Sequence, residues 1–455
     1  MQKIHARKAL TANGWESDVC LEIENGQISQ ISDDATQGGQ IVDLLLPAPT
    51  NLHSHAFQRA MAGLTETRGP DPKDSFWTWR QVMYKFLSQL TAEDAQVIAT
   101  QLYIEMLKAG YTRVAEFHYL HHEQSGDVYQ PLSTMAKAIF ESAQTSGIGL
   151  TMLPVLYRFS GFGPQPATEG QRRFINSTEQ FNQLVTECFE LSNQYSNANV
   201  GIAPHSLRAV DKPSLEQAVS HVRSLDDKAP IHIHIAEQVK EVDDCLAHYG
   251  KRPVQWLLDE VETDEYWCLI HATHIDETER RKMAELGVIA GICPTTEANL
   301  GDGIFPTTEF LEEDGVFAIG SDSHISVNAV EELRWLEYAQ RLIKQQRAVL
   351  ANSKSPSVGF NLWQKAAKGG AQSTNSNTGE LAIGKQADLL VIDQTKLGLF
   401  ANGNEHKLDS LIFASQHNMI KDVMVDGNWV IQDYKHLHEV VSAEKFTNLL
   451  MRLNS

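Results

Sequence analysis

The middle of the chain alternates between short, continuously apolar runs and segments whose apolar residues recur at helical spacing. The apolar runs have the length and composition of buried strands. Eight of them stand in order, at 44–55, 112–118, 150–156, 200–204, 231–235, 268–272, 288–293 and 317–320. Helical spacing falls between most of them, as at 92–107, 135–143, 215–222 and 329–342. This alternation predicts an α/β fold with parallel strands, and eight such units favour a (β/α)8 barrel of the TIM type.

The two ends of the chain show a different pattern, in which short strands are separated by tight turns. Asn25-Gly26 near the start and Asp426-Gly427 near the end are typical hairpin turns between apolar stretches. Neither end has enough apolar surface to form a core alone. We therefore expect residues 1–47 and 380–455 to pack together as one small β-sandwich domain, and residues 48–379 to form the barrel domain.

Side chains that can bind metal or move protons stand where these predicted strands end. His53-Ser54-His55 closes the first strand, and both imidazoles point to the same side of an extended segment. Later strands end at, or shortly before, His234, Glu237, His271 and Asp322. Because the carboxyl ends of barrel strands meet at one face, where such barrels carry their sites, we expect these groups to converge.

Three imidazoles and one carboxylate form a donor set for a single catalytic metal ion. The predicted ligands are His53, His55, His234 and Asp322. This set suits Zn²⁺, with Fe²⁺ or another divalent ion as the alternative. A metal in such a site lowers the pKa of water toward about 7, so that hydroxide is available at neutral pH.

Three residues near the predicted metal are candidates for catalysis. Glu237 lies where the chain leaves its strand, so its carboxylate can carry a proton from water to a departing nitrogen. His271 can hydrogen-bond the attacked group or hold the water in place. Asp322 can both bind the metal and accept a proton.

The remaining histidines leave alternatives open. His232 shares a strand face with His234, so spacing alone does not choose the ligand. The position of Glu237, three residues after His234, favours His234, and His232 is then a hydrogen-bonded interior residue. We expect His274 and His324 to support the site or to lie at the surface.

A second metal site is an alternative at His118, His121 and His122, which cluster after the second strand. No lysine stands at the end of the fourth strand to bridge two metals, and this favours one metal.

Composition and charge limit the partners of the protein. Among its 455 residues, of which 42% are hydrophobic, no apolar run approaches the roughly 20 residues that cross a membrane. The first eight residues lack the apolar core of a secretory signal. Five scattered cysteines fit reduced thiols, so we expect a cytoplasmic protein. The net charge of −20 repels nucleic acid and anionic membranes, and we expect neither as a partner.

A protein this acidic needs a local cationic pocket to bind an anionic small molecule. Arg80 follows the aromatic run 76–79, and Arg208 lies three residues after His205 at the end of the fourth strand. Each guanidinium could fork onto a carboxylate, and together they indicate a dianionic small-molecule substrate. The alternative is that each arginine is a surface or ion-paired residue.

The order of these motifs resembles the amidohydrolase superfamily over nearly the whole chain. The similar features are HxH after the first strand, HxxE at the fifth, histidine at the sixth, aspartate at the eighth, and the segment 384–393 that returns to a β domain. HxxE without a bridging lysine resembles the mononuclear deaminase and chlorohydrolase branch. The superfamily usually has a glycine-rich approach to its HxH. This chain has Pro-Ala-Pro-Thr-Asn-Leu at 47–52 instead, which leaves the ligands untouched.

Four further segments, at 55–61, 76–80, 116–121 and 203–210, are similar to the branch that hydrolyses N-formimino-L-glutamate. The resemblance implies that zinc-dependent hydrolysis converts this compound to N-formyl-L-glutamate and ammonia, in histidine degradation. It also implies that the substrate is bound by Gln58, Arg80, Tyr119, His205 and Arg208. Members of this family often pair, so a homodimer is compatible with the resemblance, although no apolar stripe marks an interface.

Two other functions stay open at this point. A mononuclear deaminase acting on a nucleobase such as guanine or cytosine would use Trp77 and Trp79 for stacking, but the arginines argue against it. A metal-free barrel serving as a binding or assembly protein would lack ligands, whereas this chain has the full set. The segment 65–74, rich in glycine, proline and charge, is predicted to cover the site.

Overall fold

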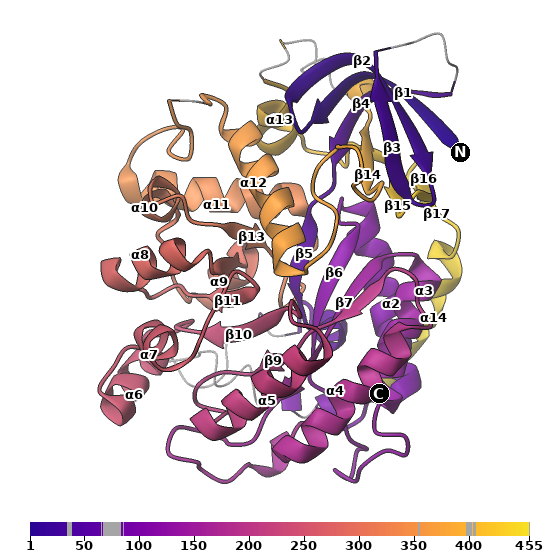
Figure 1. Ribbon diagram of the computed structural model, residues 1–455. Coiled ribbons are helices and arrows are strands. Elements are labelled where there is room, and N and C mark those ends of the chain that lie inside the picture. Colours follow the sequence, from indigo (N-terminus) through magenta and orange to yellow (C-terminus); the bar gives the residue numbers. More distant parts are fainter. Residues whose placement is uncertain are drawn as a thin grey trace.

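The computed structural model describes residues 1–33, 39–64, 66, 83, 84, 86–353, 355–396, 403 and 406–454. A ring of parallel strands occupies the centre of the molecule, with helices outside it (Figure 1). The strands are β5 (Thr50–Ser54), β6 (Arg113–His118), β7 (Gly149–Leu156), β8 (Ala198–Val200), β9 (Ala203–Pro204), β10 (Ile231–Ile235), β11 (Trp267–His271), β12 (Ile289–Ile292) and β13 (Phe317–Ile319). Parallel bridges from Ser54 to Asp322 and from Ile202 to Ile231 join its two halves. The predicted barrel is confirmed.

Helices connect these strands and cover the outside of the barrel. They are α2 (Ala92–Lys108), α3 (Thr134–Ser146), α4 (Thr178–Ser192), α5 (Lys212–Leu225), α6 (Val239–Tyr249), α7 (Pro253–Glu260), α8 (Glu277–Leu286), α9 (Pro294–Leu300), α10 (Thr307–Glu312), α11 (Ala329–Lys344) and α12 (Val358–Ser373). In α2 the side chains at helical spacing, Ile98, Leu102 and Met106, are fully buried. A capping box at Thr91 and Asp94 starts this helix. Within the described part of the chain, no helix is long and apolar enough to cross a membrane.

A second sheet lies beyond one end of the barrel and contains strands from both ends of the chain (Figure 1). Its strands are β1 (Gln2–Thr11), β2 (Gly14–Glu24), β3 (Gln27–Ser32), β4 (Gln40–Pro47), β14 (Leu389–Ile392), β15 (Ile420–Val425), β16 (Asn428–Gln432) and β17 (Lys435–His436). β4 pairs with β1 in parallel and with β14 in antiparallel fashion, so the two ends interleave. Leu21, Leu45 and Leu389 share its separate core. The small β domain expected from both chain ends is thereby confirmed.

The two predicted hairpin turns of this sheet touch each other. Gly26 has a φ of +81°, and a Cβ atom there would lie 2.4 Å from the Asp426 carboxylate. Glycine is therefore required at this position both by the backbone conformation and by the close approach of the second turn.

Two predicted strands are divided in the structure. The apolar run 44–55 bends at Pro47 and Pro49, so that its first part is β4 of the outer sheet and its second part is β5 of the barrel. The predicted fourth strand is split into β8 and β9 at Gly201, where a Cβ atom would lie 2.1 Å from the carbonyl oxygen of Pro230. The first apolar run therefore passes from the outer sheet to the barrel. The second run is interrupted where its backbone lies against that of Pro230.

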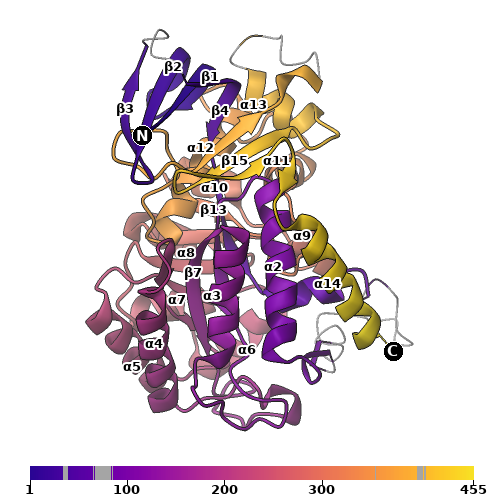
Figure 2. The ribbon, with the colours of Figure 1, turned by 90° about the vertical axis from the view of Figure 1, so that its right-hand side faces the viewer.

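The last helix, α14 (Glu439–Leu453), leaves the outer sheet and lies alongside α2 on the outside of the barrel (Figure 2). Lys108 of α2 forms an ion pair with Glu439 at 2.5 Å, and Arg452 pairs with Asp94 near the other end of α14. The chain end thus contacts the barrel as well as the outer sheet.

Candidate active site

The bridge between Ser54 and Asp322, which joins the first and last strands of the barrel, brings together groups that are far apart in the sequence. The backbone N–H of Asp322 donates to the carbonyl oxygen of His53 at 3.0 Å, and that of His55 donates to the carbonyl oxygen of Asp322 at 3.4 Å. The imidazole rings of His53 and His55 lie edge to face, with centroids 4.5 Å apart. The first and last strands therefore fix three of the predicted ligands relative to one another through the backbone.

The donor atoms of the four predicted ligands converge on one region. The Nε2 atoms of His53 and His234 are 3.1 Å apart. The Asp322 Oδ1 atom lies 3.4 Å from His53 Nε2 and 3.3 Å from His55 Nε2. His271 is near enough to join His53 and His234 in a group that could hold a metal ion. This arrangement provides three or four nitrogen donors and one carboxylate.

The opposite ring nitrogens show which atoms are free to bind a metal. Nδ1 of His55 donates to the carbonyl oxygen of Phe117 at 2.9 Å, and Nδ1 of His234 donates to that of His205 at 3.1 Å. In each ring the Nε2 atom that faces the other donors then carries the lone pair. Burial lowers the pKa of His53, His55 and His234, which favours the neutral form that binds metals. The residues therefore fit a divalent metal ion.

Glu237 and His271 stand beside this donor set. Glu237 Oε1 lies 3.7 Å from His271 Nε2, and the same ring nitrogen lies 3.9 Å from Asp322 Oδ2. Burial raises the pKa of Glu237 to about 7, which is the range in which a carboxyl group can both take up and release a proton. Burial alone would lower the pKa of His271, but the carboxylates of Glu237, Glu297 and Asp322 outweigh it and raise the value to about 10.

Glu297 is part of this site although the sequence did not single it out. Its Oε1 atom lies 3.2 Å from His271 Nδ1 and also accepts the backbone N–H of Cys293 at 2.9 Å. The residue lies on α9, directly after β12. The signal for it is its place in the first turns after a barrel strand, four residues beyond Cys293.

The predicted substrate residues that the structure describes line the same pocket as the metal donors. Gln58, Tyr119, His205 and Arg208 border this pocket together with His55, His234, Glu237, His271 and Asp322. The Tyr119 hydroxyl lies 2.9 Å from His205 Nε2, and His205 Nδ1 lies 2.9 Å from the Ser206 hydroxyl. Arg80 and most of the predicted cover at 65–74 lie outside the described residues.

Arg208 forms no direct ion pair in the described part of the chain, although the carboxylate of Glu241 is near enough to raise its pKa. Its Nη1 atom donates to the Tyr157 hydroxyl at 3.3 Å, and no carboxylate among the described residues forms an ion pair with it. The interpretation of Arg208 as an ion-paired residue therefore finds no support in the described residues. A guanidinium on the wall of a pocket in an acidic protein can bind an anion.

Three of the remaining histidines have supporting positions. His232 is buried and its Nε2 donates to the carbonyl oxygen of Ser373 at 2.7 Å, away from the donor set. His274 Nε2 donates to the carbonyl oxygen of Asp302 at 2.7 Å. His324 is fully buried, with Nε2 3.2 Å from the Ser54 hydroxyl, so a surface position for it was wrong.

The alternative second metal site does not form among the described residues. His121 Nε2 donates to the carbonyl oxygen of Val155 at 2.9 Å, and His122 Nε2 donates to that of Ile175 at 2.7 Å. Neither they nor His118 belong to a described group that could hold a metal.

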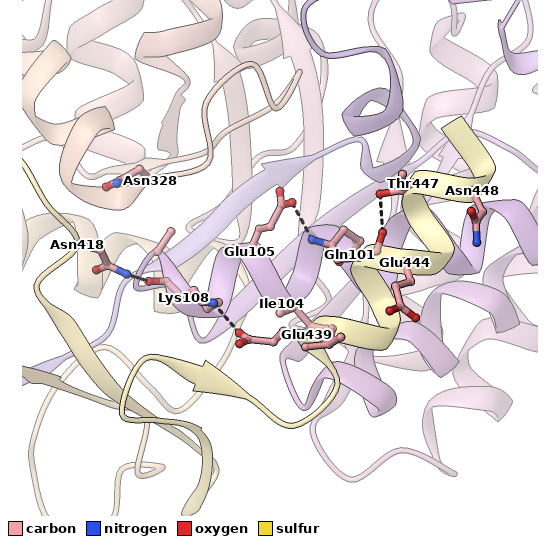
Figure 3. Close-up of a pocket in the computed structure, with 13 residues that line it drawn as sticks. Gln101, Ile104, Glu105, Lys108, Asn328, Asn418, Glu439, Glu444, Thr447 and Asn448 are labelled. Carbon is pink, nitrogen blue, oxygen red and sulfur yellow. Dashed lines mark hydrogen bonds and ion pairs between the residues drawn. The ribbon is translucent and has the colours of Figure 1, made fainter. Parts of the chain in front are cut away.

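A second hollow lies on the outside of the barrel, in the groove between α2 and α14 (Figure 3). Its volume is about 850 Å³. Its polar side chains largely satisfy one another, as Gln101 donates to Glu105 at 2.9 Å and Lys108 pairs with Glu439. The described groups that could hold a metal all lie elsewhere, at the barrel strands. We therefore assign the active site to the pocket at the strand ends.

Comparison with known proteins shows the family to which the chain belongs. Residues 44–430 match the model of the amidohydrolase family, and residues 1–40 match that of the N-terminal domain of formimidoylglutamate deiminase HutF. The chain is 48% identical to formimidoylglutamate deiminase of Pseudomonas aeruginosa over the full length of both proteins. It is 26% identical to 8-oxoguanine deaminase of the same organism, over 93% of this chain and 92% of that one.

Solved structures give the same relationship. An amidohydrolase from Brucella melitensis superimposes with a TM-score of 0.95 and 44% identity over the whole of both chains. An adenosine deaminase from Xanthomonas campestris with bound zinc has a TM-score of 0.83 and 20% identity over 100% of this chain and 98% of that one, and so shares the fold. The chain therefore belongs to the amidohydrolase family of hydrolytic enzymes, as a full-length relative of the formimidoylglutamate deiminases.

Proposed function

We propose that this enzyme hydrolyses the C–N bond of N-formimino-L-glutamate. Water adds to the amidine carbon, the bond from that carbon to the terminal nitrogen breaks, and the products are N-formyl-L-glutamate and ammonia. The full-length relative from Pseudomonas aeruginosa, at 48% identity, supports this substrate. This compound carries its amidine at one end and two carboxylates on the glutamate part, so the pocket must offer both a hydrolytic centre and cationic anchors.

Arg208 is the observation that carries the choice of substrate. It lines the pocket of the metal donors and has no ion-pair partner among the described residues. A planar guanidinium can bind a carboxylate through two parallel hydrogen bonds. A neutral nucleobase would leave this partly buried guanidinium without a bound anion, with only the carboxylate of Glu241, beyond ion-pair distance, to offset its charge. A substrate carboxylate is therefore the partner that best fits Arg208, and Arg80 is proposed to bind the other one.

We propose Zn²⁺ as the metal, held by His53, His55, His234 and Asp322. Imidazole nitrogens and carboxylate oxygens are common zinc ligands, and a catalytic zinc keeps a further position for water. The metal would supply an activated water at neutral pH. Fe²⁺ remains the alternative, because the same donors also suit it.

The chain's own residues would then bind the substrate and move its protons. Glu237 takes a proton from the attacking water and delivers it to the departing nitrogen, a role for which its pKa of about 7 is suited. His271 donates a hydrogen bond to the group under attack, since its raised pKa keeps it protonated. Asp322 orients the water. Gln58, Tyr119 and His205, on the same pocket wall, bind the substrate.

The test is ammonia release by the zinc-loaded protein with N-formimino-L-glutamate, guanine, cytosine, 8-oxoguanine and adenosine offered separately. We expect turnover of N-formimino-L-glutamate alone. Turnover of a base instead would contradict the proposal, although the site assignment would stand. Failure to bind any metal and to turn over any of these compounds would favour a protein without catalytic activity.

We further propose that the enzyme serves histidine degradation in the cytoplasm, with residues 48–379 as catalytic domain and 1–47 and 380–455 as the β domain. A gel-filtration and light-scattering measurement would decide between a monomer and the homodimer that the resemblance allows.

A further inference from the structure

Glu241 lies in the first turn of α6, and its carboxylate faces back toward the turn that carries Glu237. Its Oε1 atom accepts the backbone N–H of Ala236 at 3.1 Å, and its Oε2 atom accepts the backbone N–H of Glu237 at 3.1 Å. The two carboxylate oxygens thus hold two consecutive peptide groups. Glu337 holds the consecutive N–H groups of Val349 and Leu350 in the same way, so a glutamate can fix a turn through both of its oxygens.

The turn that Glu241 holds is conformationally demanding. Ala236 has a φ of +50°, in the left-handed region that costs an alanine free energy. Its carbonyl oxygen accepts the backbone N–H of His274 at 3.0 Å. Gln238, at the start of α6, makes no side-chain capping hydrogen bond. The turn is therefore held by hydrogen bonds from two directions. The backbone N–H of His274, after β11, donates to its carbonyl oxygen, and the carboxylate of Glu241 accepts its N–H groups.

We propose that Glu241 is a positioning residue that sets the direction in which Glu237 projects toward His271 and the metal donors. The proposal rests on the proposed function in that it assumes the proton transfer by Glu237. The Glu237 side chain begins at the peptide whose N–H Glu241 accepts, and its Oε1 atom ends 3.7 Å from His271 Nε2. A displacement of about 1 Å in such a group can lower the rate about 100-fold.

A glutamine at position 241 separates this role from a simple loss of volume. Its amide has one acceptor oxygen, so it can accept one of the two N–H groups, while its own N–H₂ faces the other donor. The side chain keeps its size, but the turn loses one of its two hydrogen bonds. Asp243 offers the matched control, because it is exposed on the same helix and Asp243→Asn removes the same charge without touching the turn.

A different effect is expected if Glu241 acts through Arg208 instead. The two side chains are close enough for Arg208 to counter the effect of burial on the pKa of Glu241, although they form no ion pair. Weakened anchoring of the substrate by Arg208 would raise KM. Misplacement of Glu237 lowers kcat, because it affects the chemical step after the substrate has bound.

The experiment compares the wild type with Glu241→Gln, Glu241→Ala and Asp243→Asn. The measured quantities are kcat and KM with N-formimino-L-glutamate, metal content, and hydrogen–deuterium exchange of the peptide 231–240 by mass spectrometry. We expect Glu241→Gln to lower kcat about 10- to 100-fold with KM changed less than about 3-fold and metal retained, and Glu241→Ala to lower kcat further. Exchange at Ala236 and Glu237 should accelerate in both variants and stay at the wild-type rate in Asp243→Asn.

Two results would overturn the proposal. One is an unchanged kcat in Glu241→Gln together with a lower melting temperature, which would show a purely structural role. The other is a raised KM with kcat retained, which would assign the effect to Arg208. If the wild type does not turn over this substrate, the proposed function fails. The exchange measurement still decides whether Glu241 holds the turn. Unchanged exchange in Glu241→Gln would contradict the proposal that Glu241 positions Glu237.

Discussion

The metal side and the substrate side of the pocket are held in place by different means. On the metal side, backbone groups fix the donors, as when Phe117 and His205 offer carbonyl oxygens to the rings of His55 and His234. On the substrate side, side chains hold one another, as Tyr119 does with His205 and Tyr157 does with Arg208. Backbone positions belong to the barrel and change little with sequence, whereas contacts between side chains can be exchanged. The comparison teaches that substitutions on the substrate side should alter specificity while the metal site survives.

The largest expected effect lies on the metal side, where His234→Ala removes a donor. We expect metal content to fall to a trace and kcat/KM to fall more than about 1000-fold, because water is no longer activated. Its matched partner is Glu237→Gln, which should keep the metal while kcat falls about 100- to 10,000-fold. Metal analysis and ammonia release on the same preparations check both. Loss of metal from Glu237→Gln would mean that Glu237 is itself a ligand.

The next effect lies on the substrate side, with Arg208→Met. We expect kcat/KM to fall more than about 100-fold, on the scale of about 3 kcal/mol for a lost charged hydrogen bond, with metal content unchanged. Arg7→Met serves as the control, because the Arg7 side chain is 69% exposed on β1, in the outer sheet. Steady-state kinetics with N-formimino-L-glutamate decide. Equal kinetics in Arg208→Met and the control would remove the main argument for an anionic substrate.

The smallest effect is expected at Glu297, whose carboxylate contacts His271 Nδ1, the ring nitrogen opposite the one that faces Glu237. Its carboxylate helps to raise the pKa of His271, so Glu297→Gln lowers that pKa and His271 loses its proton at a lower pH. The alkaline limb of the pH profile of kcat should therefore move to lower pH, while the acidic limb stays in place. Glu312→Gln, at an exposed position on α10, is the control. An unmoved alkaline limb would show that His271 is not the group that titrates there.

The sequence was sufficient to predict the barrel and the convergence of its polar groups, for a physical reason. Parallel strands in a closed barrel end at one face, so residues that end strands must meet there whatever separates them in the chain. His53, His234 and Asp322 could be brought together by this rule alone. The same rule needs no knowledge of side-chain conformation.

Other features could not be predicted because they depend on details finer than an apolar pattern. The run 44–55 is apolar throughout, and nothing in its periodicity shows that it passes from one sheet to another at Pro47. Glu241 and Glu297 act through hydrogen bonds to a backbone turn and to a ring, and these depend on exactly how a helix begins after its strand. A glutamate in the first turn of a helix is ordinarily explained by the helix dipole.

The interleaving of the two chain ends has a consequence for how the protein is made. Leu46 of β4 pairs with Leu390 of β14, and Ser54, between the first two donors, bridges to Asp322. While the ribosome is still adding the middle of the chain, β4 has an open edge and the histidines next to it lack their partners. Contacts between such distant segments form slowly, and open strand edges promote aggregation. The site is therefore completed late in synthesis, because its donors cannot come together until the strand that precedes Asp322 has emerged.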